Sequence, residues 1–297
     1  MPRKFYTLDV FTNSAMTGNP LAVVLDSAGL DDATMQAIAN EFNLSETVFV
    51  FPPDKIENRA FIRIFTSVRE LPFAGHPTVG TAILLSHLDR SDDFVLEEKV
   101  GPVRCVISRE GEVSAARFEL PKRSERLALD IDLELLGGAL GLPVAAFGFD
   151  DHLVGVWDAG VPYTLVPVKS LEYVKNIQIN LEKLRQVEPI IDGNGGNPYV
   201  YCRGGDALDA DFHARMFAPL HGTPEDPATG SAVASLSGLI LQADMSDNES
   251  RSFKIEQGYE MGRPSQIGLD LERQNGIAAR AGISGSAVIV SEGVLHI

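Results

Sequence analysis

The sequence predicts an α+β protein of two similar halves, each a strongly curved β-sheet wrapped around one buried helix. Three observations predict this fold class: short strand-like runs dominate the 297 residues, two helical segments are almost free of charge, and those two segments begin alike. A helix that is apolar on every face must be buried on all sides. An ordinary β-sandwich would leave two such helices without a place, and the length suits about two domains.

The strands are predicted from runs rich in β-branched and aromatic residues with turn-like flanks. In the first half these runs are residues 5–11, 21–26, 46–51, 59–66, 101–108 and 113–120. In the second half they are residues 163–168, 198–203, 251–258, 265–272 and 286–293.

One outer helix is predicted over residues 31–43, where acidic residues cap the start. Its apolar residues share one face, as in an amphipathic helix that covers a core: Met35, Ile38, Ala39 and Phe42. Shorter helices are predicted over residues 133–142 and 181–187.

The two apolar helices are predicted over residues 76–88 and 226–243, and their first residues read HPTVGTA and DPATGSA. A second pair, GNPLAVV (18–24) and GVPYTLV (160–166), recurs in the same order about half a chain apart. Together these pairs predict an internal duplication. We expect an N-terminal lobe over 1–125 and a C-terminal lobe over 126–297, whose last strand can cross to the N-terminal lobe.

Charge and composition exclude several classes of function. The net charge is −16 without a basic tract, which argues against binding nucleic acid or an anionic membrane. No apolar run is long enough to span a bilayer, and the N-terminus lacks a signal-peptide pattern. The two cysteines form no CxxC and the histidines form no close ligand pair, so we expect no metal site and a cytoplasmic location. Phosphate-loop and dinucleotide motifs are absent.

The beginnings of the two apolar helices are predicted to form the functional site. Pro77 and Pro227 suit the first helical position, which places His76 and Asp226 at the caps. The small residues that follow would let an anionic group approach the exposed N–H donors of each helix. If the halves face each other, both starts would meet at one cleft. The simpler interpretation is that Asp226 only caps its helix and His76 only fills space.

Several segments resemble the phenazine-biosynthesis PhzF family. They are FTNSAMTGNPLAVV (11–24), NLSETVFV (43–50), RIFTSVRELPFAGHPTVGTA (63–82), RMFAPLHGTPEDPATGSA (215–232) and QGYEMGRPS (257–265). The resemblance implies the diaminopimelate-epimerase-like fold, in which two pseudo-symmetric lobes each hold a central helix inside a β-barrel. It also implies a cofactor-independent isomerase that is often a homodimer.

The resemblance also implies the site residues. Diaminopimelate epimerases carry cysteines where this chain has Ala74 and Asp226, so a two-thiol mechanism is not available here. The PhzF family uses a glutamate, a histidine, an aspartate and a serine that match Glu46, His76, Asp226 and Ser231. Glu46 precedes an apolar segment, and the partial burial this suggests suits a carboxyl group that takes a proton and gives it back.

We therefore expect an isomerase that shifts a proton within a small carboxylate-bearing substrate, without metal or cofactor. Glu46, His76 and Asp226 are the predicted catalytic residues. Ser45, Gly75, Gly230 and Ser231 are predicted to bind the substrate. One alternative is a serine hydrolase built from Ser231, His76 and Asp226, although TGSAV lacks the G-x-S-x-G elbow. The other is a non-catalytic protein that binds a small ligand. The sequence does not name the substrate.

Overall fold

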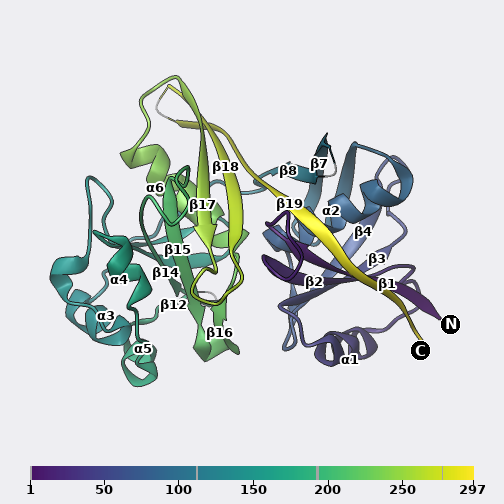
Figure 1. Cartoon of the computed structure of the whole chain (residues 1–297), viewed down its shortest axis with the longest axis horizontal. Coiled ribbons are helices and arrows are strands. Elements are labelled where there is room, and N and C mark those ends of the chain that lie inside the picture. Colours follow the sequence, from purple (N-terminus) through teal and green to yellow (C-terminus); the bar gives the residue numbers. More distant parts are fainter. Residues whose placement is uncertain (1, 112, 192–193, 276) are drawn as a thin grey trace. The chain divides into compact units, whose positions relative to one another are not determined.

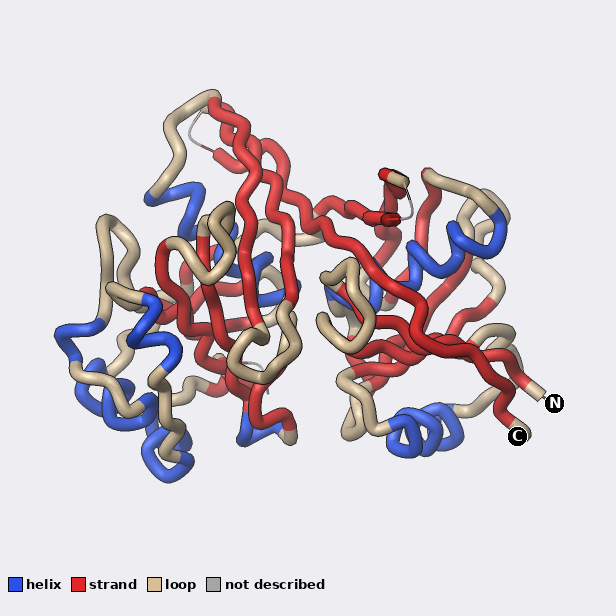
Figure 2. Tube along the Cα trace, viewed as in Figure 1, coloured by secondary structure: helices blue, strands red, loops and turns tan. Residues whose placement is uncertain are grey.

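The computed structural model describes residues 2–111, 113–191, 194–275 and 277–297 (Figure 1). The chain divides into two compact units. Unit 1 comprises residues 1–121 and 283–297, and unit 2 comprises residues 122–282. Strands make up most of the regular structure in each unit (Figure 2). The last strand, β19 (Ile277–Leu295), begins in unit 2 and ends in unit 1.

Unit 1 is a closed β-barrel. Its strands are β1 (Arg3–Val10), β2 (Asn19–Val24), β3 (Glu46–Phe51), β4 (Ala60–Phe65), β6 (Asp93–Glu98), β7 (Gly101–Glu110), β8 (Val113–Glu119) and β19, with the short β5 (Glu70–Leu71) on β4. Each strand pairs with the next in that order, and β19 pairs with both β8 and β1. Because β19 closes the ring, the barrel needs residues from both ends of the chain.

Helix α2 (Gly75–Asp89) fills this barrel, while α1 (Asp32–Phe42) packs outside it on β3 and β4. Helix α2 contacts β1, β2, β3, β7 and β8, and its residues from Gly75 to Ser86 are buried. A strand between two helices must be apolar on both faces. In β2, Leu21 accordingly approaches α2 while Val24 packs in the α1 cluster.

Unit 2 contains a curved sheet around helix α6 (Gly230–Ala243). Its strands are β9 (Glu125–Arg126), β10 (Gly155–Asp158), β11 (Pro162–Pro167), β14 (Asn197–Arg203), β15 (Phe212–Ala218), β16 (Thr223–Asp226), β17 (Glu249–Gln257) and β18 (Ser265–Gln274). They pair as β9–β10–β11–β14–β15–β17–β18, with β16 also on β15. Helix α6 contacts β9, β10, β11 and β18, from both ends of this run, so the sheet curves around the helix.

Smaller elements cover the outside of this sheet. They are α3 (Leu133–Leu140), α4 (Leu171–Lys175), α5 (Leu181–Val187), the 3₁₀ turns Val144–Ala146 and Pro219–His221, and the hairpin of β12 (Ile190–Ile191) with β13 (Asn194–Gly195). Leu136 and Leu140 of α3 pack with Val166, Val200 and Phe217 of the sheet in one apolar cluster.

The predicted outer helix agrees with α1. Asp31 caps it by accepting a hydrogen bond from the Thr34 N–H, and Met35, Ile38 and Ala39 are buried. The predicted starts of the two central helices are wrong. Helix α2 begins at Gly75 after Ala74, so His76 lies inside its first turn instead of at the cap. Helix α6 begins at Gly230 after Thr229, and Asp226 ends strand β16.

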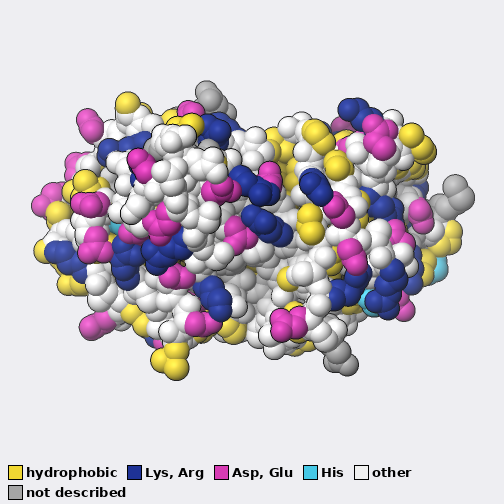
Figure 3. Space-filling model, turned by 90° about the horizontal axis from the view of Figure 1, so that it is seen from above, with side chains coloured by type: hydrophobic (Ala, Val, Ile, Leu, Met, Phe, Trp, Pro, Cys, Tyr) yellow, Lys and Arg dark blue, Asp and Glu magenta, His cyan; other side chains and the backbone are white. Residues whose placement is uncertain are grey.

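The surface carries charges of both signs. On the face shown in Figure 3, Lys and Arg side chains are interspersed with Asp and Glu side chains. Within the described residues, no helix combines the length and the apolar character that crossing a membrane would require.

The close contact between α2 and the barrel wall can be tested at Gly80. A Cβ atom there would lie 2.6 Å from Leu21 Cδ2 and 2.7 Å from Val10 Cγ2, and both neighbours are fully buried. We expect Gly80→Ala to lower the free energy of unfolding by about 1–3 kcal/mol in urea denaturation, because the wall must shift.

The matched control is Gly138→Ala in α3, where the new methyl group would meet only the flexible side chain of Lys183. This variant should be neutral, or more stable by up to ~1 kcal/mol because alanine favours helix. Equal stabilities of the two variants would contradict the tight packing of α2.

Candidate active site

Glu46 and His76 form a buried pair at the start of α2. Glu46 is the first residue of β3 and His76 the second residue of α2, and their side chains are 15% and 5% exposed. Glu46 Oε2 lies 3.0 Å from His76 Nε2. The alignment is not that of a hydrogen bond, and neither atom has another hydrogen-bond partner among the described residues. Loose contacts of this kind are common in catalytic pairs before the substrate binds.

Asn19 orients the ring of His76 from the opposite side. This fully buried residue opens β2, and its Nδ2 lies 3.4 Å from His76 Nδ1. An amide nitrogen only donates, so with this orientation Nδ1 accepts and the proton of a neutral ring lies on Nε2, facing Glu46. Sequence reasoning missed Asn19. The signal was present, because GNPLAVV has a polar residue where its repeat partner GVPYTLV has Val161.

A buried carboxyl group also supports the start of α2. Glu98 ends β6, and its Oε1 lies 2.7 Å from the Thr78 hydroxyl, which in turn lies 2.8 Å from the Ala74 carbonyl. Burial raises the pKa of Glu98 to about 8, against a smaller lowering by Thr78. A neutral Glu98 can donate to Thr78, and Thr78 can then donate to Ala74. This chain of two hydrogen bonds ties α2 to the barrel wall.

In unit 2, Gln257 holds the segment between β16 and α6. Its Nε2 donates to the Asp226 carbonyl (2.7 Å) and the Thr229 hydroxyl (2.9 Å), and its Oε1 accepts from the Thr229 N–H (3.2 Å). The Thr229 hydroxyl donates to Asp226 Oδ2. These bonds satisfy backbone groups that a helix would otherwise use, which explains why α6 does not begin at Pro227.

Ser231 lies in the first turn of α6, where its hydroxyl is 2.8 Å from that of Tyr163 on β11. Tyr199 on β14 is fully buried near Tyr163 and Asp226. Burial, followed by the charges of these two neighbours, raises the pKa of Tyr199 well above its usual value. Its hydroxyl has no hydrogen-bond partner among the described residues. The start of α6 therefore faces a group of hydroxyls, which the sequence did not predict.

The starts of α2 and α6 differ from those of the outer helices α1, α3 and α5, although the short outer helix α4 also lacks a side-chain cap. Side chains of Asp31, Asp132 and Asn180 cap α1, α3 and α5 by accepting backbone N–H bonds. No side chain caps α2 or α6, although Ala74, His76 and Thr229 are buried. The first N–H groups of a helix need an acceptor from elsewhere, and a buried start without a cap suits an anionic ligand.

The predicted residues therefore fall into two groups. In unit 1, Glu46 and His76 touch each other, Gly75 opens α2, and Ser45 directly precedes Glu46. In unit 2, Asp226 lies beside the start of α6, which Gly230 and Ser231 form. Ser231 contacts Tyr163, and Asp226 contacts Thr229.

The cysteines, Cys105 and Cys202, are buried free thiols. Burial raises the pKa of the Cys105 thiol far above its usual range, and burial and neighbouring charges raise that of Cys202 to about 12. Neither thiol forms a thiolate at neutral pH.

Among the described residues, one group of side chains has the spacing of metal ligands. Asp206, His213 and Glu256 place one ligand atom each within 4.8 Å of one another. The oxygens of Glu256, however, already accept from the N–H groups of Asp206 and Ala207 and from His213 Nδ1. Nε2 of His213 contacts a further carboxylate, Glu260. A metal ion would have to displace these donors, so the group is an ion-pair cluster.

The family model described as phenazine biosynthesis-like protein matches residues 8–293. The chain belongs to the PhzF family. It is 48% identical to an uncharacterized isomerase of Mesorhizobium japonicum, with 99% of each chain covered. It is 33% identical to a trans-2,3-dihydro-3-hydroxyanthranilate isomerase of Pseudomonas chlororaphis, with 98% of each covered. These relatives identify the chain as an isomerase of this family.

The solved structures agree on the fold. A PhzF-family protein of Bacillus anthracis superposes with a TM-score of 0.88 at 24% identity, and all of both chains is covered. A hydroxyproline epimerase from Agrobacterium vitis, solved with bound trans-4-hydroxy-L-proline, gives a TM-score of 0.62 at 12% identity, covering 99% of this chain and 92% of that one. The second likeness shows the shared fold alone.

The raised pKa of the buried Glu98 predicts how the stability of the protein depends on pH. The pKa of Glu98 is about 8 in the folded protein and near 4.5 in the unfolded chain, so the folded state holds the proton more tightly. Glu98 therefore stabilises the fold fully below pH 4.5. Its contribution falls by up to about 1.4 kcal/mol per pH unit as the pH rises to about 8.

We expect Glu98→Gln to remove this contribution, so that the slope measured by urea denaturation between pH 5 and 8 becomes shallower by up to about 1.4 kcal/mol per pH unit. Glu110→Gln, at an exposed position of β7, serves as the control and should retain it. If Glu98→Gln kept the wild-type slope, the assignment of a protonated Glu98 in the folded protein would be wrong.

Proposed function

We propose that this protein moves a proton between two carbon atoms of a small carboxylate-bearing substrate, with no metal or cofactor. The observation that carries the proposal is the Glu46–His76 pair, which lies at the uncapped, buried start of α2. A carboxylate, an imidazole and a helix start without a side-chain cap together provide a base, a partner that orients it and a place for an anion.

In this proposal Glu46 is the acid/base group. Its carboxylate removes a proton from one carbon, and the electron pair is delocalised over the conjugated system of the substrate. The neutral Glu46 then returns the proton to a second carbon, so the substrate is neither oxidised nor reduced. The Nε2–H of His76 faces the carboxylate and can hold it in place in both states.

The remaining predicted residues would bind and polarise the substrate. Backbone N–H groups at Gly75 and His76 in unit 1, and at Gly230 and Ser231 in unit 2, are suited to a carboxylate. Asp226 would accept a hydrogen bond from a hydroxyl or amino group of the substrate. Ser45 would contribute a hydroxyl beside Glu46.

The relatives suggest the class of substrate. Trans-2,3-dihydro-3-hydroxyanthranilate, named for the Pseudomonas chlororaphis relative, is a cyclic diene that carries a carboxylate, an amino group and a hydroxyl group. We propose a compound of this class, a dihydroaromatic or related unsaturated carboxylate, as the substrate of this chain.

We also propose that the two units arose by duplication and are pseudo-symmetric. The strand pairings support this. In unit 1 the successive pairings are antiparallel β1–β2, parallel β2–β3, antiparallel β3–β4, antiparallel β4–β5, parallel β4–β6 and antiparallel β6–β7. Unit 2 repeats the same directions in the same order, in β10–β11, β11–β14, β14–β15, β15–β16, β15–β17 and β17–β18. In both series the central helix follows the fifth strand.

The proposal predicts that Glu46→Gln loses turnover but not binding. We expect kcat to fall by about 10²–10⁴-fold, while the affinity for the substrate changes little because Gln keeps the size of Glu. Turnover of trans-2,3-dihydro-3-hydroxyanthranilate would be followed by absorbance. Uptake of deuterium from heavy water at the substrate carbons would be followed by NMR.

Glu57→Gln, at an exposed position in unit 1, is the matched control and should behave as wild type. Full activity of Glu46→Gln on any substrate that the wild-type protein converts would refute the assignment. Ligand binding without deuterium exchange, across a panel of unsaturated carboxylates, would favour the binding-protein alternative.

A further inference from the structure

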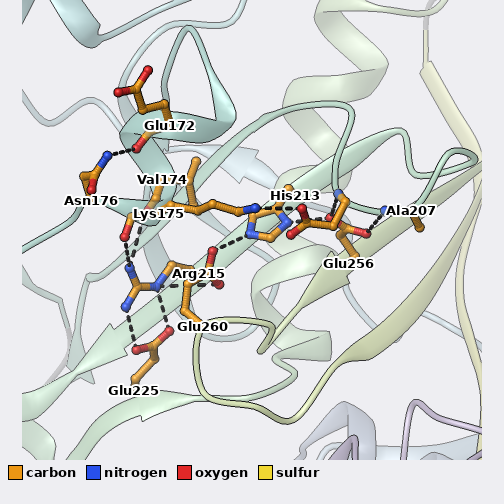
Figure 4. Close-up of polar contacts among 11 residues, drawn as sticks. Glu172, Val174, Lys175, Asn176, Ala207, His213, Arg215, Glu225, Glu256 and Glu260 are labelled. Carbon is orange, nitrogen blue, oxygen red and sulfur yellow. Dashed lines mark hydrogen bonds and ion pairs between the residues drawn. The ribbon is translucent and has the colours of Figure 1, made fainter.

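A chain of charged side chains in unit 2 runs to Glu225, the residue that precedes Asp226 (Figure 4). We define the charge chain as Glu256, His213, Glu260, Arg215 and Glu225. Glu256 Oε1 lies 2.5 Å from His213 Nδ1, and Glu260 Oε1 lies 2.9 Å from His213 Nε2. Arg215 Nε lies 3.9 Å from Glu260 Oε2, and Arg215 makes two bonds of 2.8 Å to Glu225.

His213 is the centre of the charge chain and carries two protons. The residue is fully buried on β15, and each of its ring nitrogens faces a carboxylate. Burial lowers the pKa of His213, but the hydrogen bonds to Glu256 and Glu260 outweigh it and raise the pKa to about 9. The same bonds lower the pKa of both glutamates, despite the opposite effect of burial. At neutral pH an imidazolium therefore lies between two carboxylates.

The ends of the charge chain adjoin the site residues. Glu225 directly precedes Asp226, and Glu256 directly precedes Gln257, whose side chain holds Asp226 and Thr229. Through these neighbours, His213 is linked to β16, which leads into the turn before α6, and to β17, whose Gln257 holds that turn.

Glu260 extends this link to the loop after β17. The loop spans residues 258–264 and packs against Pro227, since a Cβ atom on Gly258 would lie 2.6 Å from the Pro227 carbonyl oxygen. Gly258 has a φ of +80°, which a side chain would disfavour. Residues before and after Gln257 are thus both paired to the same imidazolium.

We propose that His213 is a positioning residue, whose imidazolium holds β16, β17 and the 258–264 loop so that Asp226 and the first turn of α6 keep one orientation toward the substrate. This inference rests on the proposed role of Asp226 in binding the substrate. His213 itself does not touch the reacting atoms in this proposal.

The proposal makes the orientation depend on pH. When His213 loses its proton, two buried carboxylates are left around a neutral ring that can donate to only one of them. The other charged or titratable groups near His213 are Tyr259, Cys202, Arg215 and the Asp206–Lys175 pair. Tyr259 and Cys202 have pKa values of about 12, so a change near pH 9 belongs to His213.

The first experiment needs no substrate. In ¹⁵N-labelled protein, the Gln257 side-chain amide and the Thr229 N–H should shift together with the His213 ring signals, with a midpoint near pH 9. In Glu260→Gln the midpoint should move down by about one pH unit or more, because one anion next to the ring is lost. In His213→Gln the shifts should disappear.

The matched control is His221→Gln. His221 is exposed in the same unit and pairs with Glu188, outside the charge chain, through a 2.7 Å contact. This variant should keep the wild-type titration of Gln257 and Thr229. If the Gln257 and Thr229 signals did not follow the titration of His213, the inference would be overturned.

The second experiment measures kinetics with trans-2,3-dihydro-3-hydroxyanthranilate. His213→Gln should lower kcat/KM by about 10–100-fold, mostly through KM, because binding groups are misplaced while Glu46 is intact. The wild-type KM should rise above pH 9, and this limb should move to lower pH in Glu260→Gln, a milder variant that keeps the imidazole.

Asp226→Asn separates this inference from the proposed function. If Asp226→Asn leaves KM unchanged, the proposed role of Asp226 in binding the substrate is wrong. The NMR titration then still tests, independently, whether His213 is coupled to Gln257. If Asp226→Asn raises KM but neither His213→Gln nor Glu260→Gln changes KM or its pH dependence, His213 has no positioning role.

Discussion

A helix that is buried on every side must still satisfy the N–H groups of its first turn, and this constraint organises both units. Helices α2 and α6 carry almost no charge and lie inside curved sheets, so water cannot serve them as it serves the outer helices. Neither has a side-chain cap. Each unit instead holds the start of its helix with hydrogen bonds from the wall. Glu98 of β6 bonds to Thr78 of α2 in unit 1, and Gln257 of β17 bonds to Asp226 and Thr229 in unit 2.

These anchors fix where each first turn lies without capping it by a side chain. A catalytic site needs such rigid supports, because misplacement by about 1 Å can cost about 10²-fold in rate. The proposed base, Glu46, is supported in a similar way. Asn19 holds one side of the His76 ring, and the other side of the ring faces Glu46.

Much of the fold could be predicted from local patterns. The uncharged segments identified both central helices, and the amphipathic pattern with its capping acid identified α1. The helix starts could not be predicted from the repeat, because they depend on partners distant in sequence. In DPATGSA, Gln257 from β17 holds the Pro-Ala-Thr residues out of the helix, whereas in HPTVGTA the helix already begins at Gly75.

The candidate site follows the same rule. Glu46, His76, Asp226 and Ser231 stand in recognisable motifs, so the sequence could name them. Asn19 was visible only as a polar residue at an apolar position of the repeat. His213, Glu256 and Glu260 had no local signal at all, because 43 residues separate His213 from Glu256 and only the parallel pairing of β15 with β17 brings them together.

Buried carboxyl groups lie near the helix start in each unit, but they are protonated in unit 1 and ionised and paired in unit 2. Both arrangements suit an anionic substrate. In unit 1, the acid near the start of α2 is neutral at pH 7, because burial raises the pKa of Glu98. An ionised Glu98 would repel a substrate carboxylate at that helix start. In unit 2, Glu256 and Glu260 are ionised but share the imidazolium of His213, and Glu225 is paired with Arg215. In a protein with a net charge of −16, local neutralisation of the acidic groups around the site favours the binding of an anion. Protonation of Glu98 achieves this in unit 1 and ion pairing achieves it in unit 2, so we expect titration of Glu98 and His213 to act on the helix starts.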